Sequence, residues 1–240
     1  MCIRDRCFDL KDRGAIAPGY RGDVVLLDDL KDFHVNRVFV EGALVAEEGK
    51  YLPEIKKCDI SSVKGSVIVK DFSKEKFKMN LKSNKVNVIK ILPGGVVTAK
   101  DTAEIELDAN GEFVRNPEVD LVKVAVVERH QGTGNVACGF LKGYGIKEGA
   151  VALSVAHDSH NIIVVGVNDE EMEFAVNSLI EQEGGIVLVK EGKVIESMPM
   201  PIAGLMSDQS GEWVDQKLTD IHEKANEAVS YTHLRAHETG

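Results

Sequence analysis

Two histidines, an aspartate, a serine and an asparagine occupy five consecutive positions of the sequence, His157-Asp158-Ser159-His160-Asn161. Imidazole and carboxylate groups transfer protons, and hydroxyl and amide groups donate and accept hydrogen bonds. Apolar runs flank the segment, Val151 to Ala156 before it and Ile162 to Val165 after it, and runs of this length predict buried strands. A core cannot solvate so many polar groups. We therefore expect a loop, held by two strands, that can transfer protons or bind a polar ligand.

The spacing of His157 and His160 also permits a metal half-site, because side chains three positions apart can converge on one ion. Asp158 would then join as a ligand or orient an imidazole ring. His130 is the nearest other histidine in the sequence. The alternative is a structural loop whose side chains hydrogen-bond backbone groups at the strand ends. The sequence alone leaves these interpretations open.

A second cluster of ionisable residues, Glu128-Arg129-His130, follows the apolar run Leu121 to Val127. The run predicts a buried strand, and charged groups at the ends of strands are frequent components of binding sites. A surface ion pair beside a solvated histidine explains the same residues equally well. Other catalytic patterns are absent: there is no GxGxxG or P-loop, and Ser159 lacks a nucleophile elbow. The four cysteines, Cys2, Cys7, Cys58 and Cys138, form no CxxC pair, which argues against a zinc knuckle or a disulfide framework.

The elements that position the loop are predicted by periodicity. Residues 169–182 carry apolar side chains at helical spacing, with Asn168 as the N-cap and Glu171 placed for a capping box. Gly184-Gly185 is expected to end this helix. A second, more polar helix is expected over residues 211–228. Further strands and hairpins are predicted at 23–28, 35–40 with 43–45, 85–92, 103–107 with 112–114, and 186–189 with 193–197.

The remaining stretches are predicted to be irregular. Residues 50–84 contain Pro53 and many lysines and predict a linker, and the glycines of residues 132–149 predict a flexible or tightly turned segment. Strands outnumber helices, so we expect a β-rich mixed α/β fold with a mixed sheet. We place a first unit at residues 7–62 and a second at 63–229. Residues 1–6 and 230–240 resemble translated sequencing-adapter fragments and are expected to be non-native; the alternative is that both ends are genuine disordered termini.

Composition limits the classes of function. The chain has 240 residues and a net charge of −10, with only 5% aromatic residues. An acidic chain without a basic face is not expected to bind nucleic acid. No apolar run approaches the roughly 18 residues of a membrane-spanning helix, so no membrane partner is expected. The unpaired cysteines favour a reducing, cytoplasmic compartment.

Two sets of motifs resemble known families. The segments Gly14-Ala15-Ile16-Ala17-Pro18-Gly19 and Asp23-Val24-Val25-Leu26-Leu27-Asp28, followed by Val38 and Gly42, resemble the part that closes the small β-sandwich of amidohydrolases. The usual dipeptide there is Ala-Asp, and this chain has Gly22-Asp23. The second half resembles the C-terminal domain of bacterial adenine deaminases. That resemblance is carried by Glu128-Arg129-His130, Gly132-Thr133-Gly134-Asn135, Gly139-Phe140, Lys142-Gly143, the segment 157–166, and Pro201-Ile202-Ala203-Gly204-Leu205-Met206-Ser207.

The resemblance implies a parent enzyme that hydrolyses adenine to hypoxanthine and ammonia in purine salvage. It implies a divalent metal, manganese or iron, held by a catalytic barrel that this sequence lacks, and no metal ligand within this chain. The chain would supply a domain that covers the barrel mouth, and it would be inactive alone. His157, Asp158 and His160 would support catalysis, and Ser159, Asn161, Glu128 and His130 would bind the substrate.

Adenine, the barrel domain of the same chain and further copies in a homo-oligomer are the expected partners. Two alternatives stay open. The first is a non-catalytic domain that packs or oligomerises, with a structural polar loop. The second is a self-contained metallohydrolase that uses His157, His160 and His130.

Overall fold

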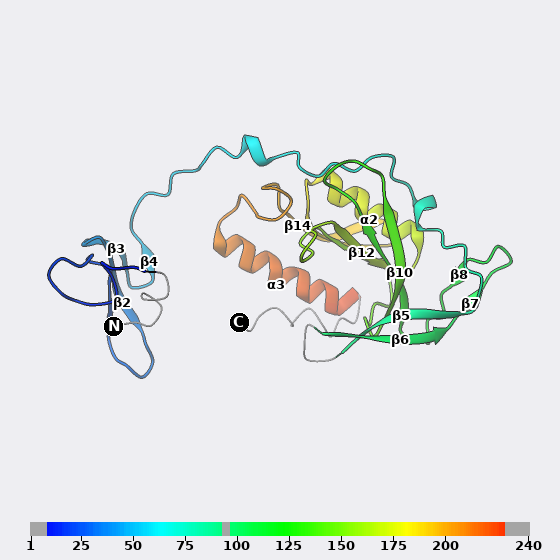
Figure 1. The fold of residues 1–240 in the computed structure, drawn as a ribbon, viewed down its shortest axis with the longest axis horizontal. Coiled ribbons are helices and arrows are strands. Elements are labelled where there is room, and N and C mark those ends of the chain that lie inside the picture. The colour runs from blue at the N-terminus through cyan, green and yellow to red at the C-terminus, as the bar shows by residue number, and fades with distance from the viewer. Residues whose placement is uncertain (1–8, 93–96, 229–240) are drawn as a thin grey trace. The chain divides into compact units, whose positions relative to one another are not determined.

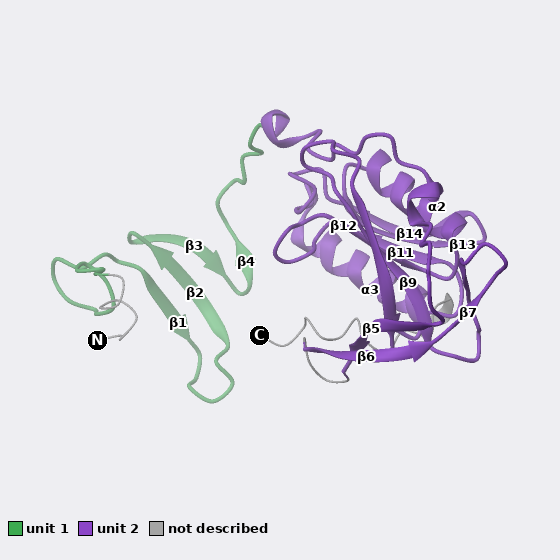
Figure 2. Cartoon of the chain, turned by 45° about the vertical axis from the view of Figure 1, so that its right-hand side comes forward, with its two compact units in different colours: residues 1–59 green, residues 60–240 purple. Residues whose placement is uncertain are grey.

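The computed structural model describes residues 9–92 and 97–228. The chain forms two compact units, residues 1–59 and 60–240, coloured separately in Figure 2. Each unit has its own sheet, and each is described by itself below. None of the helices in the described ranges is long and apolar enough to cross a membrane.

The first unit is a four-stranded antiparallel sheet in the order β1-β2-β3-β4. The strands are β1 (Val24–Leu27), β2 (Val35–Val40), β3 (Ala43–Glu47) and β4 (Lys50–Tyr51). The predicted hairpin between β2 and β3 is confirmed: Glu41 and Gly42 both have positive φ angles, 53° and 80°, as the tightest hairpin turns require. None of the described residues of this unit, 9–59, is buried, so its sheet has no core of its own.

The second unit contains an eight-stranded sheet in the order β14-β13-β11-β12-β9-β10-β5-β6. Neighbouring strands are antiparallel except for β10 and β5, which are parallel. The predicted mixed sheet is therefore confirmed (Figure 1). The bounds are β5 (Lys85–Ile91), β6 (Thr98–Glu104), β9 (Leu121–Val127), β10 (Val136–Lys142), β11 (Ala150–Leu153), β12 (Ile162–Gly166), β13 (Gly185–Lys190) and β14 (Lys193–Pro199).

Two helices, α2 (Asp169–Glu181) and α3 (Gly211–Ala228), cover opposite faces of this sheet (Figure 1). Successive residues of a strand point to opposite faces. Accordingly, Ala125 of β9 packs in the cluster that contains Met172 of α2, whereas Val122 packs in the cluster that contains Ala225 of α3. The sheet is thus the middle layer of three, which holds its strand ends rigidly.

The helix predicted over 169–182 is confirmed to within one residue. The Oδ1 atom of Asn168 accepts a hydrogen bond from the backbone amide of Glu171 at 2.8 Å, as an N-cap should. The second hydrogen bond of a capping box, from the backbone amide of Asn168 to the side chain of Glu171, is not among those that the described residues form. The Oε1 atom of Glu171 instead accepts the backbone amide of Gly192 at 3.1 Å, which ties α2 to the β13–β14 turn.

Three sequence predictions are wrong. The glycine-containing stretch 132–149 includes β10, which pairs along its length with β9. The predicted linker 50–84 contains β4 and two short 3-10 helices, η1 (Ser61–Val63) and η2 (Lys74–Phe77), and the side chain of Phe77 is fully buried in the core. The predicted hairpin arm 103–107 is divided: its first part belongs to β6, and only β7 (Glu106–Leu107) pairs with β8 (Phe113–Val114).

Candidate functional site: a polar loop at one end of the sheet

The predicted loop lies where three central strands meet. Leu153 of β11 is paired with Ile163 of β12, and Ile162 is paired with Val127 of β9. The β11–β12 connection and the residues after β9 therefore emerge at the same end of the sheet. The prediction that polar residues 157–161 lie on a loop between strands is confirmed.

The first two residues of the loop project into solvent. The side chain of His157 is 79% exposed and that of Asp158 is fully exposed, with His157 Nδ1 3.8 Å from Asp158 Oδ1. The peptide bond between them is cis. The imidazole rings of His157 and His160 lie 5.3 Å apart, centre to centre. One exposed imidazole and one exposed carboxylate, those of His157 and Asp158, thus lie beside the partly buried imidazole of His160.

The second half of the loop turns back toward the protein. The backbone amide of His160 donates to the carbonyl of Ala156 at 2.6 Å, and the amide of Asn161 donates to Ser159 Oγ at 3.4 Å. Two side-chain atoms, His160 Nδ1 and Asn161 Oδ1, are buried and have no hydrogen-bond partner among the described residues. Buried polar atoms without partners are costly, so a ligand or partner that reached either atom would gain a hydrogen bond.

The carboxylate of Glu128 organises the neighbouring segment. It accepts the backbone amides of His130, Gln131 and Thr133 at 2.5, 2.8 and 2.9 Å, and the hydroxyl of Thr133 at 2.9 Å. These hydrogen bonds, led by the amide of Thr133, lower the pKa of Glu128 to about 2. Glu128 is therefore a permanently ionised acceptor near neutral pH, directed at its own loop.

His130 joins the two predicted clusters, because its Nε2 atom lies 2.9 Å from the backbone carbonyl oxygen of Ser159. The sequence places Arg129 in the candidate cluster with Glu128 and His130 but predicts no role for it. Its side chain is 1% exposed, and its Nε atom donates to the carbonyl of His160 at 2.5 Å. The sequence signal for Arg129 is its place in a run of three ionisable residues that follows an apolar strand.

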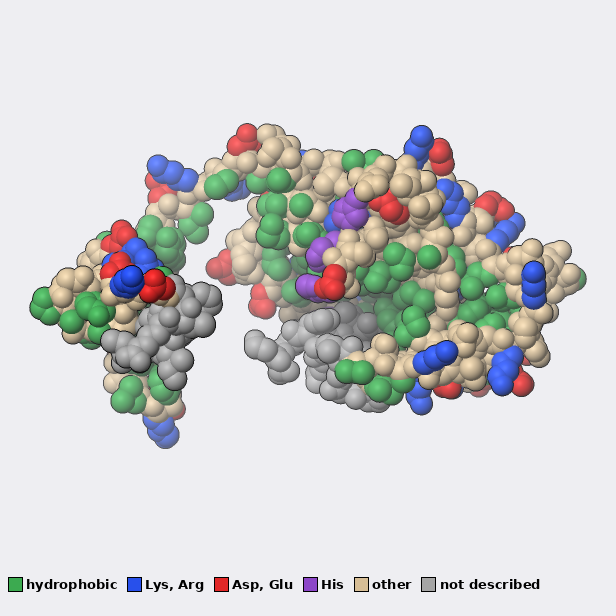
Figure 3. All heavy atoms as spheres, in the orientation of Figure 1, with side chains coloured by type: hydrophobic (Ala, Val, Ile, Leu, Met, Phe, Trp, Pro, Cys, Tyr) green, Lys and Arg blue, Asp and Glu red, His purple; other side chains and the backbone are tan. Residues whose placement is uncertain are grey.

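Exposed apolar side chains lie on segments that adjoin this loop or are hydrogen-bonded to its neighbours, and we call this set the apolar rim. The amide of Ala203 donates to the carbonyl of Val63, and the amide of Ile68 donates to the carbonyl of Arg129. The members and their exposed fractions are Val63 (38%), Ile68 (51%), Val155 (36%) and Met206 (58%). Figure 3 shows histidine side chains gathered on one face of the second unit, next to hydrophobic ones.

The described residues do not form a metal site. No group of three or more His, Cys, Asp or Glu side chains that could hold an ion comes together in residues 9–92 and 97–228. His130 is directed at a backbone carbonyl, so His130, His157 and His160 do not act as one ligand set. The self-contained metallohydrolase gains no support from this geometry.

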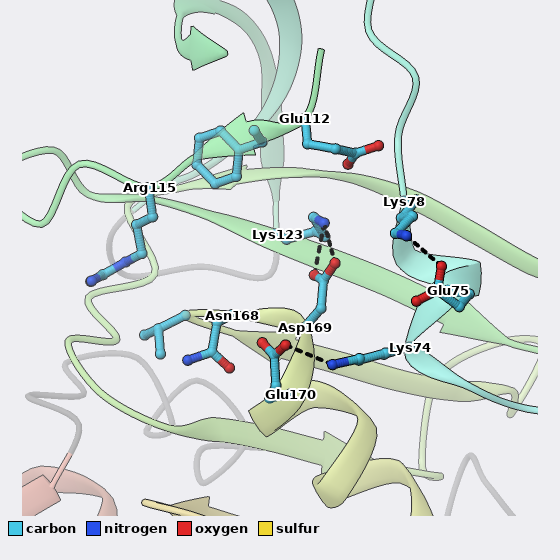
Figure 4. Close-up of a pocket in the computed structure, with 11 residues that line it drawn as sticks. Lys74, Glu75, Lys78, Glu112, Arg115, Lys123, Asn168, Asp169 and Glu170 are labelled. Carbon is cyan, nitrogen blue, oxygen red and sulfur yellow. Dashed lines mark hydrogen bonds and ion pairs between the residues drawn. The ribbon is translucent and has the colours of Figure 1, made fainter. Parts of the chain in front are cut away.

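A cavity of about 470 Å³ lies at the opposite end of β9, beside the first turn of α2 (Figure 4). Most of its charges are paired with each other. Lys123 Nζ is 2.7 Å from Asp169 Oδ1, Lys74 Nζ is 2.9 Å from Glu170 Oε1, and Lys78 is paired with Glu75. This end of the sheet is therefore an ion-pair network rather than a second polar loop.

The fold and the site define a mixed α/β domain that presents a histidine-containing polar loop at one end of its central sheet. Residues 95–238 match the family model of the adenine deaminase C-terminal domain. The chain belongs to that family.

Curated relatives agree with this assignment. The chain is 62% identical over 223 residues to adenine deaminase 2 of Desulfotalea psychrophila, covering 93% of this chain and 39% of the relative. It is 45% identical over 220 residues to adenine deaminase of Ligilactobacillus salivarius, covering 92% of this chain and 38% of the relative. The chain thus spans about two fifths of the length of these relatives.

Proposed function

We propose that this chain is the C-terminal part of an adenine deaminase and that loop 157–161 closes over the purine bound by the rest of that protein. The observation that carries the proposal is the 62% identity, along nearly the whole chain, to a relative named adenine deaminase 2. The loop supports it, because it presents proton-transfer and hydrogen-bonding groups on a rigid strand frame.

The chemistry proposed for the whole protein is hydrolytic. Water adds to C6 of adenine, the bond from C6 to the amino nitrogen breaks, and the products are hypoxanthine and ammonia. In this scheme His157, Asp158 and His160 support proton transfer at the amino group. Ser159 and Asn161 form hydrogen bonds with the edge of the purine ring. Glu128 and His130 hold the loop from the adjacent segment, and substrate contact by these two residues stays a prediction.

We assign the divalent metal, manganese or iron, to the part of the longer protein outside this chain. The described residues do not offer a ligand set for it, so no step here is assigned to the metal. A homo-oligomeric state, a cytoplasmic location, a role in purine salvage and inactivity of this chain alone also stay predictions.

The apolar rim supports the covering role. Exposed apolar side chains gain free energy when a partner packs against them, and contacts that surround a few central residues exclude water from them. We therefore propose that the rim packs against the catalytic barrel of the same longer protein. The polar loop would then be desolvated, which strengthens its hydrogen bonds to the substrate.

The test is kinetic and uses a full-length adenine deaminase that carries this segment. We expect His157→Ala and Asp158→Ala each to reduce kcat/KM for adenine at least tenfold, which corresponds to about 1.4 kcal/mol of transition-state stabilisation. His34→Ala, which removes an imidazole of the first unit, is the matched control and should keep wild-type kinetics. Wild-type kinetics in both loop variants would refute the proposed role. Wild-type kinetics together with a changed oligomer mass in these two variants would favour the alternative, a non-catalytic domain that packs or oligomerises.

A further inference from the structure

Arg129 is a buried cation whose two described side-chain hydrogen bonds both go to backbone carbonyls. We propose that it is a positioning residue that holds the catalytic loop 157–161 in its working conformation by clamping it to the turn 202–206. The inference rests on the proposed function of that loop. It adds a residue that contacts neither substrate nor reacting atoms and acts only through the backbone of its neighbours.

The guanidinium connects segments that are far apart in the sequence. Its Nε atom donates to the carbonyl of His160 at 2.5 Å, and its Nη2 atom donates to the carbonyl of Ala203 at 3.1 Å. The backbone carbonyl of Arg129 accepts the amide of Ile68 at 2.8 Å. A planar guanidinium fixes the directions of its donors, so the two accepting carbonyls are held in a defined relative geometry.

The turn 202–206, at the other end of the clamp, leaves space for the guanidinium of Arg129. Gly204 has a φ of +69°, and a Cβ atom at this position would lie 2.6 Å from Arg129 Nη1. Ser154 Oγ donates to the carbonyl of Gly204 at 2.5 Å and accepts the amide of Gly185 at 2.7 Å. The turn is thereby fixed to the sheet, and the guanidinium transmits that rigidity to the loop.

Stability alone does not explain this arrangement. The side chain is 1% exposed, and burying a cation costs free energy that a well-packed apolar residue would not. Burial also lowers the pKa of the guanidinium, which nevertheless stays charged near neutral pH. What the cation supplies is two charge-assisted hydrogen bonds with fixed geometry. One of them ends on the backbone carbonyl of His160, inside the loop.

A matched pair of glycine variants tests the clamp in the full-length enzyme. Gly204→Ala places a methyl group against the guanidinium, whereas Gly192→Ala has a similar φ of +67° and no atom within 4 Å of the new Cβ. Both changes carry the same kind of backbone strain. We expect Gly204→Ala to lower kcat at least tenfold with a smaller change in KM, and Gly192→Ala to stay within twofold of wild type. Equal kcat values in the two folded variants would overturn the proposal.

Replacing the arginine itself gives an independent readout. In Arg129→Ala we expect a kcat loss of at least tenfold, faster hydrogen exchange in residues 155–162, and partial recovery of kcat with millimolar guanidinium. His157→Ala should show no such recovery. If Arg129→Ala does not fold, Arg129→Lys decides: it keeps the charge but cannot reach both carbonyls, and full kcat in this variant overturns the proposal.

Failure of the clamp and failure of the proposed function give different results. If His157→Ala and Asp158→Ala keep wild-type kinetics, the loop has no catalytic role and both ideas fall. If those variants lose activity while Arg129→Ala and Gly204→Ala keep it, only the clamp is refuted. Faster exchange in residues 155–162 without loss of kcat likewise refutes the clamp, because the loop would then work without being fixed.

Discussion

Lys123 and Asp169 form a partly buried ion pair across the start of α2, with Lys123 Nζ 2.7 and 3.0 Å from the two carboxylate oxygens of Asp169. The lysine side chain is 7% exposed and the aspartate side chain 24%. The same Nζ donates to the carbonyl of Phe77 at 3.0 Å. The pair therefore joins β9, α2 and η2 at the end of the sheet opposite the polar loop. Figure 4 shows the side chains of Lys123 and Asp169 facing each other.

The two partners of this pair should respond unequally to mutation. Asp169→Asn leaves a buried ammonium without its counter-charge, and we expect it to lower the free energy of unfolding by about 3 kcal/mol. Lys123→Met leaves only a partly exposed carboxylate at a helix N-terminus, where negative charge is favoured, and should cost about 1 kcal/mol. Urea unfolding measures both, and equal losses would contradict the asymmetry.

Glu128 should make stability depend on pH in the acidic range. Its pKa in the folded chain is lowered to about 2, against an ordinary value of 4.5. A carboxyl group with a lowered pKa stabilises the fold fully above its unfolded pKa, and this contribution is lost as pH falls toward its folded pKa. Glu128→Gln should therefore cost about 1 kcal/mol at pH 7, and its difference from wild type should shrink between pH 4.5 and pH 2.

The control for this prediction is Glu118→Gln, at an exposed position where only the backbone amide makes a described hydrogen bond. It should be indistinguishable from wild type across the same range. Thermal unfolding followed by circular dichroism at several pH values gives the comparison. A Glu128→Gln difference that stays constant down to pH 2 would mean that the carboxylate's charge contributes nothing.

The features predicted correctly from the sequence are those encoded locally. Helix α2 is predictable because its apolar stripe and its N-cap, Asn168, lie within one continuous segment. Loop 157–161 is predictable because five polar residues interrupt an apolar run. In both cases residues a few positions apart determine the conformation, so periodicity and composition were sufficient.

The features that were missed depend on residues far apart in the sequence. Strand β10 contains Gly139 and no clean alternation, and it is ordered by pairing with β9 on one side and β5 on the other. Arg129 is buried because carbonyl groups 31 and 74 positions away accept its hydrogen bonds. No local sequence pattern predicts such distant hydrogen-bond acceptors, and a charged residue is expected at the surface unless other evidence places it in the interior.

Phe77 tests the correction to the predicted linker. It lies among lysines, yet its ring is fully buried and contacts Phe72 edge to face at 5.5 Å between ring centres. We expect Phe77→Ala to cost about 3 to 4 kcal/mol in chemical unfolding. Phe174→Ala, on α2 with 36% of the residue exposed, is the matched control and should cost about 1 kcal/mol or less. Similar losses of unfolding free energy in the two variants would mean that residues 74–77 behave as a linker and not as part of the core.

The apolar rim should matter for activity rather than for folding. Met206 is 58% exposed and lies in the turn held by Arg129. We therefore expect Met206→Glu to leave the fold of this chain intact while it places a charge in the proposed contact with the barrel. Burial of an unpaired charge is unfavourable, and we expect kcat/KM of the full-length enzyme to fall about tenfold. Val194→Glu provides the control, because Val194 is 44% exposed and lies in β14 next to the turn at the opposite end of the sheet. Steady-state kinetics distinguishes the two variants, Met206→Glu and Val194→Glu. Thermal unfolding checks the folded fraction of each protein first. Equal kcat/KM values for these variants would show that the surface around the loop stays in water in the complete enzyme.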